Sequence, residues 1–335
     1  MSDYTPIKAL VIISRDLDKA STRFRFAQYE PLLRQRGVLL DYVRRDAIDA
    51  GVLERLPDYD VLINQKCLLR RALAKKIIAR SRRIVFDLDD AIWTRSGRRH
   101  SWWTAFRVKS RLVQWLREAD VVTAANEYLA DYARQYSSRV KVVHMALDLE
   151  QWQPRQTDRG HEKTVTIGWA GSPATLKNLE HIAPCLCELL AIHRECRLAV
   201  YSGKRPRINC DFDYTPFASG TEAEFVRNLD IGLLPLPEDD AFTRGKSPIK
   251  VLQYLACAVP VVGQIRVATG EILNTTNSIT VERDDDWRIA IETLLSDPAR
   301  RKQLGQAGRN FVIREHAMAH TVEQITAALR GTKEE

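Results

Sequence analysis

Short apolar runs alternate along the chain with stretches in which apolar residues recur at helical spacing. In the first half, strands are expected at 7–13, 38–43, 61–63, 84–86, 121–123 and 140–143, and helices at 23–36, 68–80, 102–117 and 127–135. Continuous apolar runs are typical of parallel strands that are covered on both faces. The alternation therefore predicts a doubly wound α/β domain.

The periodicity is lost over 151–164, which we interpret as a linker, and then resumes. Strands are expected at 165–169, 197–201, 231–234 and 259–262, and helices at 175–193, 222–227, 250–256, 287–295 and 311–329. Two such halves predict a ligand cleft at the carboxyl ends of the strands. We therefore predict two Rossmann-like domains and a C-terminal helix that returns to the first domain, with the bounds 1–150, 165–312 and 313–335.

Basic residues are concentrated in the first half of the chain. Residues 1–150 contain 28 Lys and Arg against 19 Asp and Glu, whereas the remainder contains 23 against 24. The stretch 66–117 alone has 15 basic and three acidic residues. This asymmetry predicts that the first domain meets an anionic partner. No nucleic-acid-binding module is recognised in the sequence, so nucleic acid is not the partner we expect.

Compartment and metal content are constrained by the same composition. The longest apolar runs of the 335 residues are far shorter than the roughly 20 residues of a membrane span, and no signal-peptide pattern opens the sequence. The six cysteines lack zinc-site spacing, and we expect reduced, buried thiols. These features predict a cytoplasmic protein that lies at most peripherally on the cytoplasmic face of the membrane.

The segment 230–263 carries the most informative motif, DIGLLPLPEDDAFTRGKSPIKVLQYLACAVPVVG. The open backbone around Gly245, before a helix, predicts an anion site, to which Lys246 and Lys250 add charge. The segment resembles the donor-site signature of GT4 (glycosyl transferases group 1) enzymes of the GT-B fold, E-x-F-G-x-x-x-x-E-A-x-A-x-G-x-P-V-V. Gln253 stands where the family has the glutamate that holds the nucleotide ribose, and Gly245 where it has the first glutamate.

Other segments resemble the same family in the same order. Residues 167–172, IGWAGS, resemble the glycine turn that lets backbone amides approach the diphosphate, and 201–205, YSGKR, the turn after the next strand. Residues 142–148 and 304–311 resemble the family's patterns at the end of the first domain and near the C-terminal helices. The resemblance implies donor-binding roles for Gly171, Ser172, Lys177, Lys204, Arg205, Lys246, Ser247, Ile249 and Gln253.

The resemblance also implies an activity. Such an enzyme transfers a sugar from a nucleotide diphosphate-sugar to a hydroxyl acceptor, with retention at the anomeric carbon. Backbone amides and lysines, Lys250 among them, stabilise the leaving diphosphate, so that no metal ion or other cofactor is needed. A cell-surface glycan or a lipid-linked saccharide is the acceptor that suits a basic first domain.

Three carboxylates follow a buried strand in the segment 84–93, IVFDLDDAIW. We interpret Asp89 and Asp90 as catalytic groups that bind the acceptor hydroxyl or act as a base, and Arg23 and Arg25 as acceptor-binding residues. Helix capping by the aspartates is the simpler structural interpretation. Asp87 and Asp89 also resemble the opening motif of haloacid dehalogenase-type phosphatases, which is an alternative function.

Two further alternatives stay open. Because both family glutamates are replaced, the protein could bind a nucleotide-sugar without catalysis. The segment 102–117 is helical by period, with Trp102, Phe106, Leu112, Val113 and Leu116 on one face and basic residues on the other. This helix packs against the core with a solvated basic face, or it lies on an anionic membrane surface.

Overall fold

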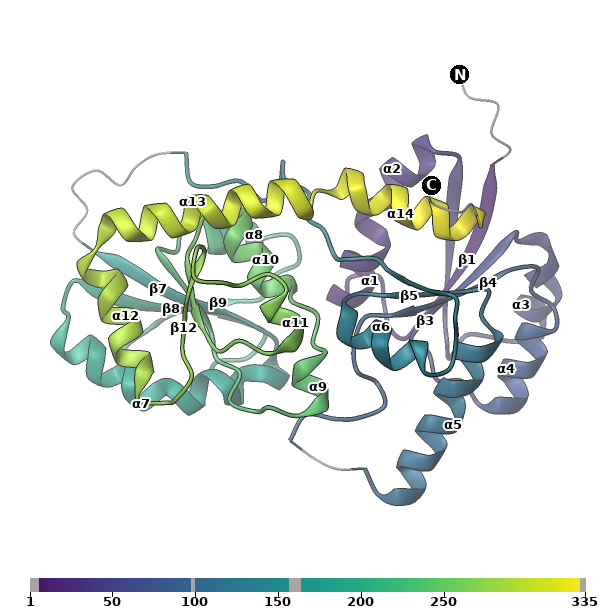
Figure 1. Ribbon diagram of the computed structural model, residues 1–335, viewed down its shortest axis with the longest axis horizontal. Helices are drawn as coiled ribbons and strands as arrows, with labels where there is room; N and C mark the ends of the chain where they lie inside the picture. Colours follow the sequence, from purple (N-terminus) through teal and green to yellow (C-terminus); the bar gives the residue numbers. More distant parts are fainter. Residues whose placement is uncertain (1–5, 98–99, 157–163, 332–335) are drawn as a thin grey trace. The chain divides into compact units, whose positions relative to one another are not determined.

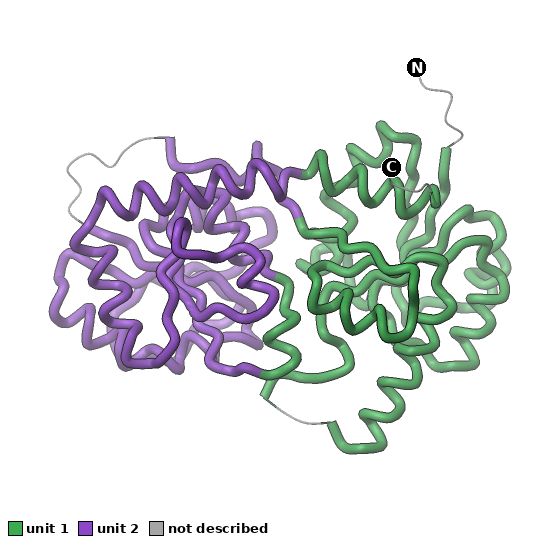
Figure 2. Tube along the Cα trace, viewed as in Figure 1, with its two compact units in different colours: residues 1–145, 240–247, 318–335 green, residues 146–239, 248–317 purple. Residues whose placement is uncertain are grey.

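The computed structural model describes residues 6–97, 100–156 and 164–331 (Figure 1). The chain divides into two compact units (Figure 2). Unit 1 comprises residues 1–145, 240–247 and 318–335, and unit 2 comprises residues 146–239 and 248–317. The chain therefore leaves unit 2 for unit 1 at Asp240 and returns at Pro248.

Unit 1 contains a six-stranded parallel sheet with the strand order β2-β1-β3-β4-β5-β6. The strands are β1 (Ile7–Ile13), β2 (Val38–Arg44), β3 (Val61–Gln65), β4 (Ile84–Leu88), β5 (Val121–Ala124) and β6 (Val140–Val142). The helices are α1 (Ala20–Arg25), α2 (Glu30–Gln35), α3 (Ala50–Arg55), α4 (Arg71–Ile78), α5 (Trp102–Glu118), α6 (Glu127–Arg134), α9 (Ala241–Arg244) and α14 (Met318–Arg330), with 3-10 turns η1 (Ala27–Tyr29) and η2 (Leu56–Asp58).

Unit 2 contains a second six-stranded parallel sheet, with the order β12-β11-β10-β7-β8-β9. The strands are β7 (Val165–Ala170), β8 (Cys196–Ser202), β9 (Asp213–Pro216), β10 (Ile231–Leu234), β11 (Val261–Gly263) and β12 (Ser278–Thr280). The helices are α7 (Leu176–Ile192), α8 (Glu222–Arg227), α10 (Ile249–Ala256), α11 (Val267–Gly270), α12 (Asp286–Ser296) and α13 (Pro298–Glu315), with the 3-10 turn η3 (Pro173–Thr175).

Each unit has its own apolar core between its sheet and the helices that flank it. The inner strands β3, β4 and β7 have every residue buried, as expected for strands covered on both faces. Trp115 of α5 and Trp287 of α12 are fully buried against these sheets, one in each unit. The predicted α/β fold class is confirmed, and the carboxyl ends of parallel strands form one edge of each sheet.

The helix predicted over 23–36 is interrupted in the structure. The chain forms α1, η1 and α2 in succession. Phe26 leaves the helical region with φ −138° and ψ −55°. Pro31, which has no N–H to donate, stands in the first turn of α2, where a helix tolerates proline.

The helix predicted over 311–329 is also divided. Helix α13 begins at Pro298 and ends at Glu315, and α14 begins at Met318. Between them the carbonyl of His316 accepts a hydrogen bond from the N–H of Leu147 at 3.1 Å. Pairing with this distant segment replaces the helical bond and ends α13.

The unit bounds differ from the predicted domain bounds. Unit 1 ends at residue 145 rather than 150, and its returning C-terminal segment starts at 318 rather than 313. The return of 240–247 to unit 1 was not predicted. Half of the predicted linker, 157–163 of 151–164, lies outside the described residues.

One pair of cysteines contradicts the expectation of reduced thiols. Cys187 of α7 and Cys210 form a disulfide with 5.4 Å between their Cα atoms. The other four cysteines, Cys67, Cys185, Cys196 and Cys257, are free. Scattered cysteines do not reveal their pairing in the sequence, so this bridge could be found only in the structure.

None of the described helices has the length and apolar character to cross a bilayer.

Candidate functional site

The turn between β7 and α7 in unit 2 is built for close approach of an anion. The N–H of Gly171 donates to the carbonyl of Tyr201 at 3.0 Å, which fixes the turn beside β8. A Cβ atom on Gly171 would lie 2.1 Å from the Trp169 ring, so the turn can hold only glycine there. No side chain caps η3 at Ser172 or α7 at Thr175. The N-terminal amides of this turn are therefore available to a diphosphate.

Gln253 of α10 carries buried polar atoms without a partner. The side chain is 1% exposed, and neither its Oε1 nor its Nε2 has a hydrogen-bond partner among the described residues. A buried amide left in this state costs free energy and needs an explanation. A ligand hydroxyl that accepts from Nε2 and donates to Oε1 supplies one, because an amide offers both functions.

Two further buried polar atoms without a described partner lie on elements that leave the same sheet edge. They are Ser202 Oγ, at the end of β8, and Asn178 Oδ1, in the first turn of α7. The amide nitrogen of Asn178 donates to the carbonyl of Pro235 at 3.2 Å, so the oxygen alone is left over. Gly203 follows Ser202, and a Cβ there would lie 3.3 Å from Pro173, which places the two turns side by side.

The lysines and arginines that were predicted to bind the donor differ in their surroundings. Lys177 forms an exposed ion pair with Glu238 at 3.2 Å. Lys204 is exposed at the turn after β8. The guanidinium of Arg205 lies over the ring of Phe212 at 4.6 Å and near that of Tyr214 at 5.5 Å. Arg205 is exposed and rests on an aromatic pair.

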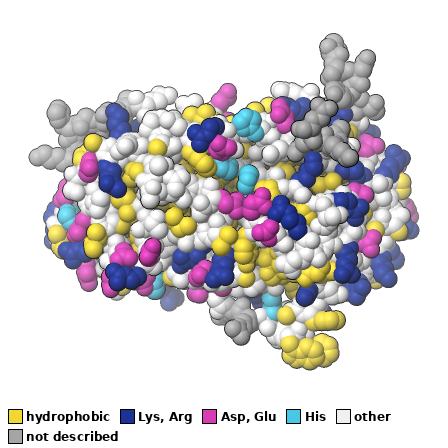
Figure 3. All heavy atoms as spheres, in the orientation of Figure 1, with side chains coloured by type: hydrophobic (Ala, Val, Ile, Leu, Met, Phe, Trp, Pro, Cys, Tyr) yellow, Lys and Arg dark blue, Asp and Glu magenta, His cyan; other side chains and the backbone are white. Residues whose placement is uncertain are grey.

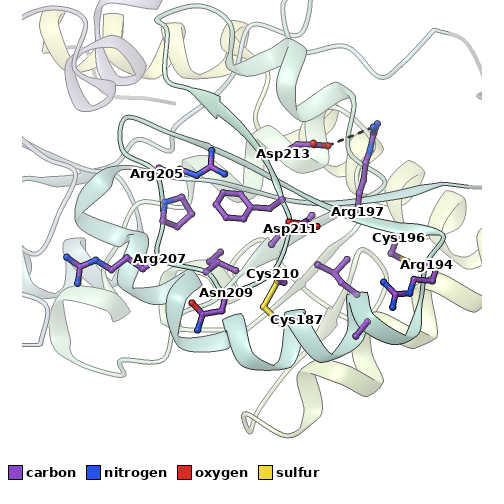
Figure 4. Close-up of a pocket in the computed structure, with 16 residues that line it drawn as sticks. Cys187, Arg194, Cys196, Arg197, Arg205, Arg207, Asn209, Cys210, Asp211 and Asp213 are labelled. Carbon is purple, nitrogen blue, oxygen red and sulfur yellow. Dashed lines mark ion pairs between the residues drawn. A yellow bond between two sulfur atoms is a disulfide. The ribbon is translucent and has the colours of Figure 1, made fainter.

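Arg205 lines a cavity of about 740 Å³ in unit 2 (Figure 4). The cavity lies between the C-terminal part of α7, the start of β8 and the loop 205–213, and the Cys187–Cys210 disulfide forms part of its wall. It reaches Cys196 at the first residue of β8, whereas the glycine turns follow the last residues of β7 and β8. Arg205 thus serves a different cavity from the edge that carries Gly171.

The predicted donor residues Lys246 and Ser247 belong to unit 1, whereas Ile249, Lys250 and Gln253 belong to unit 2. In unit 1 the carbonyl of Gly245 accepts from Asn126 Nδ2 at 3.2 Å. The hydroxyl of Ser247 donates to the carbonyl of Asp89. These bonds fasten the loop to the ends of the unit 1 strands.

The surroundings of Gly245 account for a glycine where the family pattern has its first glutamate. A Cβ at this position would lie 2.7 Å from the ring of Tyr128, and the Leu129 side chain is at 3.0 Å. The space that a glutamate would need is occupied by Tyr128. The arrangement that the first glutamate provides in the family is therefore absent at this position.

Asp87 of β4 is a structural anion. It is fully buried, accepts from Arg25 at 2.5 and 3.2 Å, and accepts from the Thr123 hydroxyl at 2.7 Å. Arg25 is 3% exposed and also donates to the carbonyl of Val143. The prediction that Arg25 binds an acceptor does not fit these contacts, because its guanidinium is already taken up by the carboxylate of Asp87 and the carbonyl of Val143.

The other predicted acceptor residue, Arg23, lies on α1 with its guanidinium over the Phe24 ring at 4.6 Å. It is half-buried.

The phosphatase alternative fails on Asp87. A nucleophile must reach phosphorus, and this carboxylate has no exposed surface and already accepts hydrogen bonds from a guanidinium and a hydroxyl.

Asp89 and Asp90 follow β4 and share one cation. Lys66 Nζ lies 2.7 Å from Asp89 Oδ1 and 2.6 Å from Asp90 Oδ2, and only the second contact has the direction of a hydrogen bond. Burial raises the pKa of Asp89 to about 6, although the ammonium of Lys66 opposes the shift. Burial by itself would lower the pKa of Lys66, but the two carboxylates outweigh it and raise that pKa.

Lys66 was missed in the sequence. It follows β3, whose last residues Asn64 and Gln65 are polar although the strand is buried, and this change at a strand end was the available signal. The residue has φ +46°, a left-handed conformation that is uncommon for lysine. Its N–H donates to the carbonyl of Asp87 at 2.9 Å, which ties it to the neighbouring strand end.

Part of the sequence and the whole fold resemble known proteins. Residues 199–327 match the model of a family described as glycosyl transferase-like. The structure of HepE from Anabaena in complex with UDP and glucose superposes with a TM-score of 0.72 at 14% identity, covering 97% of this chain and 99% of that one. The chain has the GT-B fold, and its residues 199–327 are similar to the glycosyl transferase-like family.

Other solved structures agree on the fold. Sucrose-phosphate synthase from Thermosynechococcus elongatus superposes with a TM-score of 0.73 at 14% identity, covering 97% of this chain and 98% of that one. An α-glucosyltransferase in complex with UDP gives 0.64 at 13%, covering 97% and 100%. No curated protein sequence matches this chain. Its family match lies in the half that carries Gln253, where the sequence resemblance was also strongest.

Proposed function

We propose that the enzyme transfers a sugar from a nucleotide diphosphate-sugar, with a uridine nucleotide as the first candidate, to a hydroxyl acceptor. The partnerless buried amide of Gln253 carries this proposal, because a ribose hydroxyl pair offers the donor and acceptor that it lacks. The turn that begins at Ser172 has no side-chain cap, and we propose that its N-terminal amides meet the diphosphate. The structural relatives that contain UDP or UDP-glucose support a uridine nucleotide.

Sugar transfer places negative charge on the leaving diphosphate, and the proposed mechanism depends on how that charge is stabilised. The bond from the anomeric carbon to the diphosphate oxygen breaks, a bond from that carbon to the acceptor oxygen forms, and the acceptor hydroxyl loses its proton. Turn amides and Lys250, at the start of α10, stabilise the negative charge that grows on the leaving diphosphate. We propose that this makes a metal ion unnecessary and, following the GT4 resemblance, that the configuration is retained.

The acceptor side of the proposal rests on unit 1. Asp89 and Asp90 hold Lys66 at the carboxyl end of β4, where carboxylates can bind an acceptor hydroxyl or take its proton. The excess of basic residues in this half suits a glycan or lipid-linked saccharide that carries phosphate. We propose a cytoplasmic enzyme of surface-polysaccharide assembly on this basis.

Calorimetry with EDTA present tests the donor proposal. The full-length protein is titrated with UDP, GDP, dTDP and ADP and with their glucose conjugates. We expect UDP and UDP-glucose to bind with micromolar affinity without a divalent ion, and the other bases to bind at least about tenfold more weakly. Absence of binding to every nucleotide would contradict the proposal. Binding without transfer or hydrolysis of the sugar would leave a non-catalytic binding protein.

Activity should titrate with Asp89. If its carboxylate serves the acceptor, kcat/KM rises about tenfold per pH unit below pH 6 and levels off above it, because the pKa of this group is about 6.

The contribution of Asp89 to the free energy of unfolding should change with pH in the opposite direction to the activity. A carboxyl whose pKa is raised from 3.8 contributes stability at low pH that is lost as the pH rises through about 6.

The pH profile of kcat/KM is measured for the wild type and for Asp89→Asn. The variant should have low activity and no inflection near pH 6. Asp46→Asn is the control, since that carboxylate is exposed and pairs with Arg44 at the surface. An unchanged inflection in Asp89→Asn would show that another group titrates.

A further inference from the structure

The first turns of α5 bury none of their side chains. Of its 17 residues, only Leu112, Trp115 and Leu116 are buried, all in the second half of the helix. The turns from Trp102 to Arg111 contain no buried side chain. Figure 1 shows this end of α5 projecting from unit 1.

Three aromatic side chains occupy the projecting end, which we call the aromatic tip: Trp102, Trp103 and Phe106. They are 68, 60 and 64% exposed. The rings of Trp102 and Trp103 stack with centroids 3.8 Å apart. The sequence analysis placed Trp102 and Phe106 on the same apolar face as Leu112 and Leu116, but only the latter two reach the core. Hydrophobic side chains gather in Figure 3 where Figure 1 shows this end of the helix.

A groove of about 550 Å³ runs between α4 and α5 and begins at Phe106. Its floor includes Ile78, Val113 and Tyr136. Its cationic rim consists of Arg71, Lys75, Lys109 and Arg117. Glu118 is the single acidic residue of the lining. An apolar trough with a positive border is complementary to an amphiphile with an anionic head.

The acidic residues of this region do not neutralise the rim. Between residues 66 and 117 the three carboxylates are Asp87, Asp89 and Asp90. Asp87 pairs with Arg25, and the other two pair with Lys66. Glu118 is the one carboxylate left among the four cations of the groove lining, so the rim keeps a net positive charge next to the aromatic tip.

We propose that the aromatic tip and the cationic rim dock unit 1 on an anionic lipid bilayer. Tryptophan combines a large apolar ring with one N–H donor, which suits the boundary between lipid head groups and acyl chains. Each Lys or Arg near an anionic surface adds attraction. A second copy of the chain would bring like charges together at the rim, and a polynucleotide would use the cations but leave the apolar groove unfilled.

Vesicle binding by the full-length protein tests this directly. Vesicles of phosphatidylcholine with 25 mol% phosphatidylglycerol are compared with phosphatidylcholine alone, by flotation and by quenching of tryptophan fluorescence with brominated lipid. Trp102 and Trp103 are the exposed tryptophans among the described residues, so quenching reports on the tip. We expect binding to the anionic vesicles, at least about tenfold weaker binding to neutral ones, and release at 1 M salt.

Two variants separate the two contributions. The first replaces the aromatic tip by serine (W102S/W103S/F106S), and it should lose quenching and at least about tenfold in partitioning. The second replaces the rim by serine (R71S/K75S/K109S/R117S), with an expected loss of about fivefold for each cation. Its control removes the same charge from exposed positions of unit 2 (R194S/R207S/R300S/K302S) and should bind nearly as the wild type does.

Circular dichroism and thermal unfolding, measured without vesicles, verify the fold of each variant. The docking proposal does not depend on the donor proposal, so a protein that binds vesicles but no nucleotide would support the first and contradict the second. Equal binding of the wild type and both variants to anionic vesicles would overturn it. So would sedimentation showing that the tip variant only dissociates a dimer, or preference for single-stranded RNA over vesicles.

Discussion

Replacing Asp87 with alanine should lower the free energy of unfolding by about 3–5 kcal/mol, because it leaves a buried guanidinium without its counter-ion. Arg25 is 3% exposed and donates twice to Asp87. Removing the carboxylate also strips the Thr123 hydroxyl of its acceptor. Urea denaturation followed by circular dichroism measures the loss for the purified variant.

An exposed ion pair provides the control for this buried one. Asp46→Ala breaks an exposed ion pair with Arg44 and should leave the midpoint almost unchanged, since solvent screens such pairs. The double variant Arg25→Met/Asp87→Ala removes both charges and should recover much of the loss. A single variant as stable as the wild type would show that Asp87 is not a structural anion and would reopen the phosphatase alternative.

Much of the fold could be read from the sequence because parallel sheets leave a simple signature. Strands such as β1, β4 and β7 are largely buried on both faces and therefore appear as predominantly apolar runs. Elements whose existence depends on tertiary contacts could not be predicted. The break between α13 and α14 requires the hydrogen bond from Leu147, a residue distant in the chain.

The candidate site was only partly predictable. The motif around Gln253 could be identified because its spacing is local, and the structure adds the partnerless amide that gives it a role. The interpretation of Arg25 failed because exposure cannot be judged from residue type. The assignment of Lys246 and Ser247 to the second domain failed because residues 240–247 belong to unit 1. The sequence of this loop does not indicate its hydrogen bond with Asn126.

Gln253→Leu should make the free protein more stable and the nucleotide complex weaker. The wild-type amide is buried without a partner, so an apolar side chain of similar size removes a desolvation cost of about 1–3 kcal/mol. The same change deletes the group that we propose meets the ribose, and UDP affinity should fall at least about tenfold. Urea denaturation without nucleotide and calorimetry with UDP measure the two effects.

A second buried glutamine provides the matched comparison. Gln264 is 3% exposed, and its Oε1 accepts from the N–H of Leu236 at 2.8 Å. Gln264→Leu should therefore destabilise the protein by about 1–3 kcal/mol, the opposite sign from the identical substitution at Gln253. Substitution of an ordinary core residue lowers stability and, through it, ligand binding. Substitution of a buried polar residue that only a ligand satisfies should raise stability and weaken binding. If Gln253→Leu lost stability and kept its UDP affinity, the amide would have an internal role and the ribose would be held elsewhere.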